Sequence, residues 1–297
     1  MILRKTVTAE QGGRRLDETM SILFEALSKS EARRIIDRGG CAVNSAMVRV
    51  ASRMIKAGDI IEAGIMEAGR FRELILLPEA LLYEDKALIA VNKPAGINTQ
   101  RTPYQLKGTL EYWVSEYFRH QGSNEPARVI HRLDRGTSGV MLFPKHKQAA
   151  AWLSKRFHDG AVDKVYLALV SGRPGQDVWS VDGPIGKVGT SRYGVMAEGR
   201  TALTEFRLLS TSGDFSLVEA RPQTGRTHQI RVHLEASGLP IVGDATYGGA
   251  PAVRMMLHCA SLVFKDERAV EIRVTAPPDG AFKAFMREKG LEPQRGV

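Results

Sequence analysis

The chain has 297 residues, 43% of them hydrophobic, so it is long enough to bury a core and longer than one average domain. Its formal net charge of +9 favours an acidic partner such as RNA or DNA, although a merely basic soluble protein would show the same charge. Cys41 and Cys259 form no CxxC pair, and no apolar run approaches membrane-spanning or signal-peptide form. These features argue against a disulfide framework and a thiolate metal site, and we expect a soluble cytoplasmic protein.

The first change of composition falls near residue 70, so we expect a small domain at residues 1–70. Within it, residues 28–40 predict a helix, because Ser28 and Glu31 have capping-box spacing and Gly39 with Gly40 ends the pattern. Residues 41–44 and 47–50 then alternate around a turn at Asn44, as the strands of a hairpin do. The helix is strongly basic, which a solvated helix face would also explain. Its basic residues are Lys29, Arg33, Arg34 and Arg38.

Residues 71–297 predict a larger domain of strands with interspersed helices. Strands are expected at 87–94, 127–130, 140–143, 162–170, 203–209, 215–220, 255–264 and 269–277. Helices are expected at 109–122, 148–160 and the second half of 224–238, each ending at a glycine. In the strand at 162–170, alternation places Val162, Lys164, Tyr166, Ala168 and Val170 on one face. Strands and helices do not alternate strictly, which favours an α+β fold with a mostly antiparallel sheet.

The segment "HRLDRGTSG" places Asp134 between apolar stretches at 127–130 and 140–143. A buried aspartate is costly unless it is paired or hydrogen-bonded, so Asp134 needs a partner. A carboxylate that acts as nucleophile or base must also stay ionised under a substrate, and a nearby guanidinium favours the ionised form. Arg231 is our candidate, since in a helix beginning near Thr227 it shares a face with His228 and Glu235. A surface ion pair of Arg231 is the alternative that spacing alone leaves open.

Several other motifs do not meet the requirements of known sites. "GPIGKVGTS" has too short a glycine-to-lysine spacing for a phosphate loop, and "GTSG" lacks the frame of a nucleophile elbow. His228 and His233 are five residues apart with no acidic motif between them, so hydrogen bonding explains them better than zinc binding. We therefore expect a reaction without metal or cofactor.

Three ordered blocks carry a resemblance to a known family. "HRLDRGTSGVMLF", "KVYLALVSG" and "GRTHQIRVHLEASGLPIVGDATYGG", followed by "LHCASLVF", closely resemble the pseudouridine synthases of the RluA family from about Tyr83 to Pro278. Residues 13–65 resemble the small RNA-binding module first seen in a small-subunit ribosomal protein, in which a helix and hairpin grip RNA backbone. Two positions depart from these patterns. Gly136 stands where the synthases often have an acidic residue, which affects loop conformation or substrate contacts, and Ser45 stands where glycine is usual, which points to a different hairpin turn.

The resemblance implies that Asp134 is the catalytic aspartate, which attacks the target uridine while the base is detached and re-attached through carbon five. It also implies that Tyr166 stacks against the base and is a candidate for removing the carbon-five proton, and that Arg231 pairs with Asp134. Arg132 would fill the space left by the flipped nucleotide, whose unstacking costs a few kcal/mol. Plainer roles exist for each: a core aromatic for Tyr166, a phosphate anchor for Arg132, and loop packing for His131. The RNA contacts of the N-terminal module would be Lys29, Arg33, Arg34 and Arg38.

The whole sequence therefore predicts a monomeric RNA pseudouridine synthase. Its expected fold is a mostly antiparallel mixed-sheet catalytic domain at 71–297 behind a small α/β RNA-binding domain at 1–70. Ribosomal RNA is the expected target and transfer RNA the alternative. Two rivals stay open at this point: a non-catalytic RNA-binding or ribosome-assembly protein, and a glycoside hydrolase, which would need a second carboxylate as acid that does not stand out in the sequence.

Overall fold

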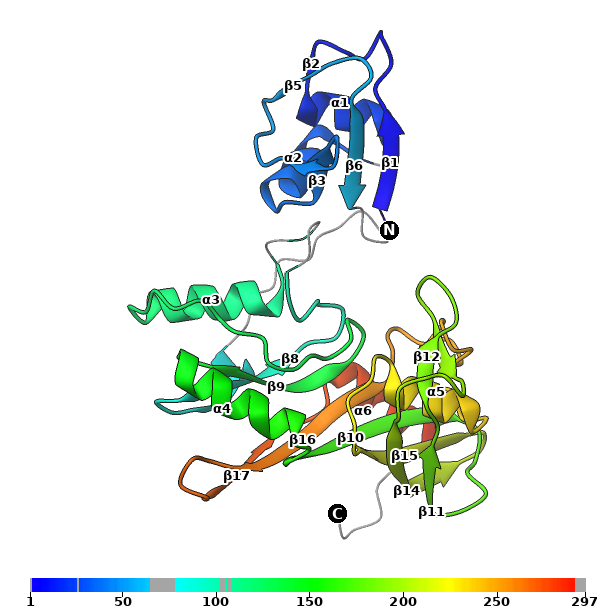
Figure 1. Cartoon of the computed structure of the whole chain (residues 1–297). Coiled ribbons are helices and arrows are strands. Elements are labelled where there is room, and N and C mark those ends of the chain that lie inside the picture. The colour runs from blue at the N-terminus through cyan, green and yellow to red at the C-terminus, as the bar shows by residue number, and fades with distance from the viewer. Residues whose placement is uncertain (1, 26, 65–77, 102–104, 106–107, 292–297) are drawn as a thin grey trace. The chain divides into compact units, whose positions relative to one another are not determined.

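The computed structural model describes residues 2–25, 27–64, 78–101, 105 and 108–291 (Figure 1). The chain divides into two compact units, Met1–Leu76 with Asn98–Ala127 and Leu77–Ile97 with Arg128–Val297. The domain boundary expected near residue 70 lies at 65–77, outside the described residues. Within the described ranges, no helix is both long and apolar enough to cross a membrane.

The N-terminal domain consists of two helices and a small sheet that share one core. Apolar residues of both helices and of three strands, Leu16, Ile35, Val43, Ile55 and Ile61 among them, form a single buried cluster. Four strands form an antiparallel sheet in the order β1-β6-β3-β4, and β2 pairs with β5. The elements are β1 (Ile2–Thr6), β2 (Arg14–Arg15), α1 (Leu16–Leu23), α2 (Lys29–Asp37), β3 (Cys41–Val43), β4 (Ala46–Met47), β5 (Met54–Ile55) and β6 (Ile60–Gly64).

Helix α2 follows the expectation from its sequence. The Ser28 side chain accepts from the Glu31 N–H, and the Glu31 side chain accepts in turn from the Ser28 N–H, which completes the capping box. Gly39, with φ of 76°, ends the helix in the left-handed conformation. At the hairpin between β3 and β4, Asn44 and Ser45 have φ of 53° and 65°, which a type I′ turn requires at both positions. The different turn expected from Ser45 is therefore wrong, because the serine adopts the conformation in which glycine is usual.

The second unit contains a nine-stranded, mostly antiparallel sheet in the order β11-β14-β15-β10-β16-β9-β8-β7, with β17 also paired to β16 (Figure 1). Among these pairings β9 and β16 are parallel, and the α+β fold class is as predicted. The unit comprises the 3-10 helix η1 (Pro78–Ala80), β7 (Leu81–Glu84), β8 (Leu88–Lys93), β9 (Ser138–Pro144), α4 (Lys147–His158), β10 (Val162–Ser171), β11 (Val178–Asp182), β12 (Ile185–Lys187), β13 (Tyr193–Val195), β14 (Leu203–Ser212), β15 (Phe215–Pro222), α5 (Gln229–Ala236), β16 (Leu257–Lys265), β17 (Glu271–Thr275) and α6 (Gly280–Lys289).

The two faces of the sheet are covered by different helices. On one face, Tyr166, Ala168 and Val170 of β10 belong to the same apolar cluster as Ile230 and Leu234 of α5. On the other face, alternate residues of β10 and β15, namely Leu167, Leu169 and Leu217, pack with Phe282 of α6. The predicted alternation in β10 thus places Tyr166 on the face that α5 covers.

Most expected elements are present, and the structure adds helix α1 and several short strands that were not expected, namely β1, β2, β5, β6, β7, β11, β12 and β13. Two further differences concern residues 127–130 and the C-terminal helix. Residues 127–130 are not a strand, because Pro126 precedes them and the Ala127 N–H donates to the Ser115 hydroxyl, 3.1 Å away, instead of to a strand. Helix α6 was not expected, although Asp279 caps its start and Gly290 ends it. In the first unit, α3 (Leu110–His120) follows the predicted helix at 109–122 and is capped by the Thr109 hydroxyl.

Candidate active site and RNA interface

Asp134 lies in the short loop that leads into β9. Its backbone C=O accepts from the Thr137 N–H at 3.1 Å, which closes a turn and presents the Asp134 side chain at its start. That side chain is 20% exposed, so the carboxylate is largely enclosed and still reachable by a substrate. The chain enters β9 through Gly139, where φ is 118° and a Cβ would lie 2.1 Å from the Cys259 carbonyl oxygen. Only glycine allows β9 to approach β16 so closely at the end of this loop.

Arg231 of α5 supplies the partner of Asp134. Its Nη1 donates to Asp134 Oδ2 at 3.0 Å, as the sequence predicts. Its Nε and Nη2 donate to both oxygens of Asp244, at 2.6 and 2.9 Å. The side chains of Arg231 and Asp244 are 9% and 2% exposed, so this bidentate pair is buried. Asp244, which the sequence reading missed, therefore fixes the plane of the guanidinium that faces Asp134.

Tyr166 lies on β10 at a point where the sheet is irregular. The pairing of β10 with β16 shifts between Val165 and Tyr166, so β16 has one extra residue opposite this position. Bulges of this kind re-aim side chains next to active sites. Burial raises the pKa of the Tyr166 hydroxyl well above its usual value, and its hydrogen bond to Cys259 and the charge of Asp134 act in the same direction. Near neutral pH the hydroxyl is therefore protonated.

A buried lysine holds the loop on the other side of Asp134. Lys93, which is 0% exposed, donates from Nζ to the carbonyl oxygens of Pro94, Ile97 and Arg135 at 3.0, 2.9 and 3.3 Å. Burial lowers the pKa of its ammonium group to about 7, although the negative charge of Asp134 opposes the shift. The Gly96 N–H also donates to the Arg135 carbonyl, at 2.7 Å. Lys93 and Gly96 together fix the residue that follows Asp134.

His228 precedes the first residue of α5 and also faces the carboxylate. Its Nε2 lies 3.7 Å from Asp134 Oδ2, and its Nδ1 lies 2.9 Å from the hydroxyl of Tyr247. The guanidinium of Arg231 stacks on the Tyr247 ring at 4.8 Å from its centroid. Of the three residues expected to share a helix face, His228 and Arg231 thus lie at Asp134. Glu235 does not, because it pairs with Arg192 at the surface.

The remaining loop residues have simpler surroundings. His131 accepts from the Leu142 N–H at 2.9 Å and stacks on Phe157 at 4.4 Å, and burial lowers the pKa of its imidazole to about 3. These contacts are the loop-packing role that we left open for it. Arg132 is exposed beside the loop. Gly136 has no left-handed φ, and a Cβ there would lie 3.2 Å from Met255, so this departure concerns packing against Met255 and not the loop conformation.

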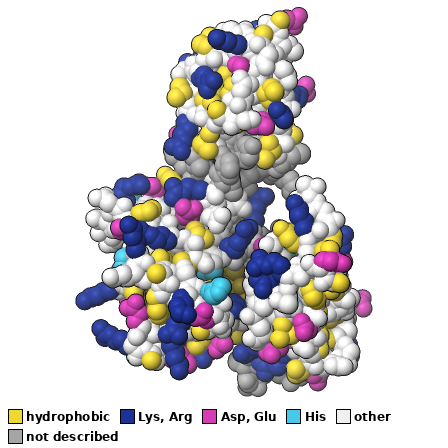
Figure 2. Space-filling view, in the orientation of Figure 1, with side chains coloured by type: hydrophobic (Ala, Val, Ile, Leu, Met, Phe, Trp, Pro, Cys, Tyr) yellow, Lys and Arg dark blue, Asp and Glu magenta, His cyan; other side chains and the backbone are white. Residues whose placement is uncertain are grey.

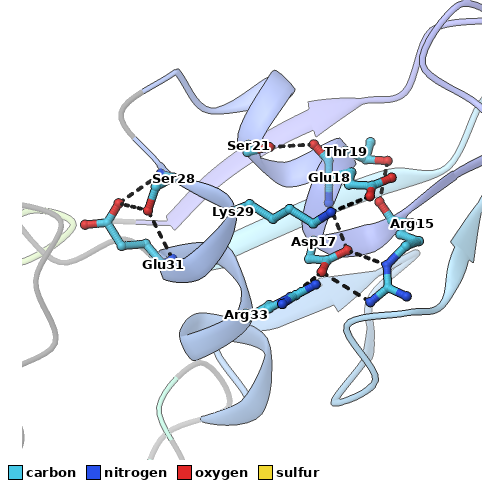
Figure 3. A network of polar contacts seen from close by, with 9 residues as sticks. All are labelled: Arg15, Asp17, Glu18, Thr19, Ser21, Ser28, Lys29, Glu31 and Arg33. Carbon is cyan, nitrogen blue, oxygen red and sulfur yellow. Dashed lines mark hydrogen bonds and ion pairs between the residues drawn. The ribbon is translucent and has the colours of Figure 1, made fainter.

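The four basic residues of α2 differ in their surroundings. Figure 3 shows Arg33 donating to the buried Asp17, which also accepts from Arg15, while Lys29 pairs with Glu18. Arg34 is exposed, and Arg38 is only 7% exposed. Lys29 and Arg33 are therefore engaged by acids of α1, Arg38 is largely withdrawn from solvent, and Arg34 is exposed and makes no ion pair within the described residues.

The basic residues of the surface are consistent with binding of an anionic ligand, but they do not form a single basic patch. Figure 2 shows Lys and Arg side chains spread over the visible face, with Asp and Glu interspersed among them. Near Asp134 the exposed cations include Arg132 and Arg135, whereas Arg231 and Lys93 are buried. A phosphate backbone approaching the carboxylate would meet the exposed guanidinium groups of Arg132 and Arg135 first.

Two comparisons of sequence define the class of protein. Residues 87–236 match the RNA pseudouridylate synthase family, and residues 14–61 match the S4 domain. The uncharacterized RNA pseudouridine synthase YlyB of Bacillus subtilis is 32% identical over 93% of this chain and 95% of its own length. Ribosomal large subunit pseudouridine synthase C of Escherichia coli K12 is 30% identical over 95% of both chains. Synthase D of Zymomonas mobilis, also named for the large ribosomal subunit, is 32% identical over 87% of this chain and 88% of its own.

The fold agrees with solved structures of the same class. The structure of human RNA pseudouridylate synthase domain containing 4 has a TM-score of 0.62 at 25% identity and covers 73% of this chain and 95% of its own. Domain containing 1 has a TM-score of 0.57 at 27% identity and covers 78% and 100%. The chain belongs to the RNA pseudouridine synthases of the RluA type and carries an N-terminal S4 RNA-binding domain. It is thus an enzyme that isomerises uridine in RNA, and the non-catalytic and glycosidase alternatives are set aside.

Proposed function

We propose that this synthase converts specific uridines of ribosomal RNA to pseudouridine, with Asp134 as the attacking carboxylate. The observation that carries the proposal is the pairing of a partly exposed Asp134 with the buried Arg231, because the guanidinium holds the carboxylate in a fixed orientation and stays beside it when RNA covers the site. Asp244 could not replace Asp134, since both of its oxygens already accept from Arg231. Tyr166 stacks against the target base, and Arg132 fills the gap left by the flipped nucleotide.

Ribosomal RNA is favoured over transfer RNA by two relatives whose names specify the large ribosomal subunit and which match nearly the whole of this chain. The S4 domain, residues 1 to about 70, supplies backbone recognition, and residues 71–297 supply the reaction, with the protein acting as a cytoplasmic monomer. Within the S4 domain the exposed Arg34, which makes no ion pair with a described acid, contacts the RNA directly, and Lys29 and Arg33 act through the surface that they build with α1.

Release of tritium from carbon five of labelled uridine in RNA tests the role of Asp134. Asp134→Asn keeps the shape of the side chain and removes the nucleophile, so we expect single-turnover product formation to fall by more than about 10³-fold while RNA affinity is retained. Asp163→Asn is the matched control, since Asp163 is an exposed carboxylate on β10 and its loss should leave the rate unchanged. Turnover near the wild-type level in Asp134→Asn would refute the assignment.

The target is tested by comparing cellular RNA with and without this protein. Pseudouridine mapping should show sites in ribosomal RNA that disappear with the gene and return with the wild-type protein but not with Asp134→Asn. Loss of sites in transfer RNA alone would replace the proposed substrate and leave the reaction itself intact.

A further inference from the structure

His228 is an unusual residue for its position at the start of α5. It is the N-cap residue of α5, where Ser, Thr, Asp or Asn is usual, and its side chain makes no capping hydrogen bond. Its φ of 57° and ψ of 19° lie in the left-handed region, which is strained for a residue with a Cβ. A strained residue that does not serve its own helix is characteristic of functional sites.

The contacts of Tyr247 fix the tautomer of the His228 ring. The Tyr247 oxygen accepts from the Tyr193 N–H at 3.0 Å, and burial raises the pKa of the Tyr247 hydroxyl, which therefore keeps its proton. Among its contacts within the described residues, the acceptor for that proton is His228 Nδ1, at 2.9 Å. Burial also lowers the pKa of the His228 imidazole, so the ring is neutral near pH 7 and has one N–H. That proton is on Nε2.

The Nε2–H points into the site with no hydrogen bond of its own in the described part of the chain. Asp134 Oδ2 is the acceptor that it faces, and at 3.7 Å the distance is too long for a hydrogen bond. The His228 side chain is 18% exposed, so this donor is partly enclosed and still accessible from the side that Asp134 shares. The Tyr193 and Tyr247 rings pack on the imidazole in T-shaped contacts, at 5.4 and 5.7 Å between centroids, and hold it in place.

We propose that His228 is a further substrate-contacting residue, whose Nε2–H donates to a carbonyl oxygen of the target uracil beside Asp134 while Tyr247 sets the required tautomer. The inference rests on the proposed reaction at Asp134. When the bond between the ribose and N1 breaks, its electron pair stays with the base and negative charge spreads to the uracil oxygens. A neutral, preoriented donor stabilises that charge and would not compete with Arg231 for the carboxylate.

Single-turnover tritium release at saturating RNA tests the donor. His228→Gly removes the ring and also relieves the left-handed strain, so folding is retained. We expect its rate to fall about 100-fold with little change in RNA affinity, and added imidazole to restore part of the rate. His228→Gln, which has a side-chain N–H of similar reach, should retain more activity than His228→Gly. A His228→Gly rate within twofold of wild type, or a loss confined to affinity, would overturn the proposal.

The role of Tyr247 has its own test. Tyr247→Phe keeps the ring under Arg231 and loses the hydroxyl, so its rate should fall less than that of His228→Gly. In the double variant the rate should equal that of His228→Gly alone, because Tyr247 acts through the imidazole. Losses that multiply would overturn this coupling.

Nitrogen NMR of the His228 ring distinguishes failure of this inference from failure of the proposed function. In the full-length wild-type protein we expect the Nε2–H tautomer, and in Tyr247→Phe a mixture of both. A ring protonated on Nδ1 in the wild type overturns the proposal whether or not the enzyme acts on the RNA supplied. If the wild-type protein releases no tritium from ribosomal or transfer RNA, the proposed function is contradicted instead. The NMR measurement then still shows whether His228 presents an Nε2–H donor.

Discussion

Asp244 accepts two hydrogen bonds from the guanidinium of Arg231, at 2.6 and 2.9 Å, in a pair that is almost fully buried. This leaves Nη1 of Arg231 directed at Asp134. The guanidinium is planar, so fixing two of its nitrogens fixes the third. Its position is therefore set by a residue thirteen positions further along the chain before any RNA binds.

Arg231→Lys should separate charge from geometry. The lysine keeps a positive charge but lacks the planar fork, so it cannot hold Asp244 and Asp134 at the same time. We expect the single-turnover rate to fall by at least about 10²-fold, while RNA affinity changes much less. Filter binding beside tritium release measures both. If affinity falls and the rate holds, Arg231 is a phosphate contact.

Asp244→Asn should act on stability as well as on rate. Without the Asp244 charge, the buried Arg231 keeps only the partly exposed Asp134 as its counter-charge, so the loss should approach the roughly 3–5 kcal/mol of unfolding free energy that breaking a buried pair costs. Glu235→Gln is the matched control on the same helix, because it breaks the exposed pair with Arg192 and should cost less than about 1 kcal/mol. Chemical denaturation of the full chain compares the two variants. Equal effects would mean that burial of the Arg231 pair contributes nothing.

Tyr166→Phe tests the hydroxyl apart from the ring. Stacking against the base is preserved, whereas the hydrogen bond to Cys259 and any proton transfer through the oxygen are lost. If the hydroxyl takes part in the reaction, the single-turnover rate should fall at least about tenfold with affinity almost unchanged. Rates for the two proteins at saturating RNA provide the measurement. Full activity would show that the ring matters and the oxygen does not.

Arg34→Gln should flatten the salt dependence of RNA binding. A phosphate contact releases counterions, so its loss should make the slope of log affinity against log salt less steep by about 0.7–0.9. Arg273→Gln on β17 makes the same change in net charge outside the S4 domain and serves as control. Binding isotherms at several salt concentrations yield both slopes. An unchanged slope for Arg34→Gln would exclude the contact.

Asp17 should make the S4 domain sensitive to acid. Burial alone would raise the pKa of its carboxyl, but hydrogen bonds from Arg15 and Arg33 outweigh it and lower the pKa from 3.8 to about 2. The stabilisation is therefore complete above pH 4 and is lost as the pH falls toward 2, by about 2 kcal/mol. Carbon NMR titration should give the low pKa in the wild type and a higher one in Arg33→Gln. Arg34→Gln should leave it unchanged, and a pKa near 4 in the wild type would contradict the prediction.

Local structure was largely determined by the sequence. The capping box of Ser28 and Glu31 involves residues three apart, and the alternation in β10 repeats every two residues, so both can be recognised without knowing the fold. The missed helix α6 also had local signals in Asp279 and Gly290. The strand predicted at residues 127–130 is absent, because an apolar pattern forms a strand only where a neighbouring strand is available to pair with it.

The roles proposed for Asp134, Tyr166 and Arg231 come from ordered motifs, and tertiary structure decided how these residues are held together. Arg231 reaches Asp134 across 97 positions of the chain, and Lys93 reaches Arg135 across 42. No spacing rule covers such distances, because they depend on how β8, β9, β10 and β16 pair and on which face α5 covers. No sequence pattern marks Asp244, Lys93 or Tyr247 as functional. They become part of the site because the fold buries them beside the charges of Asp134 and Arg231.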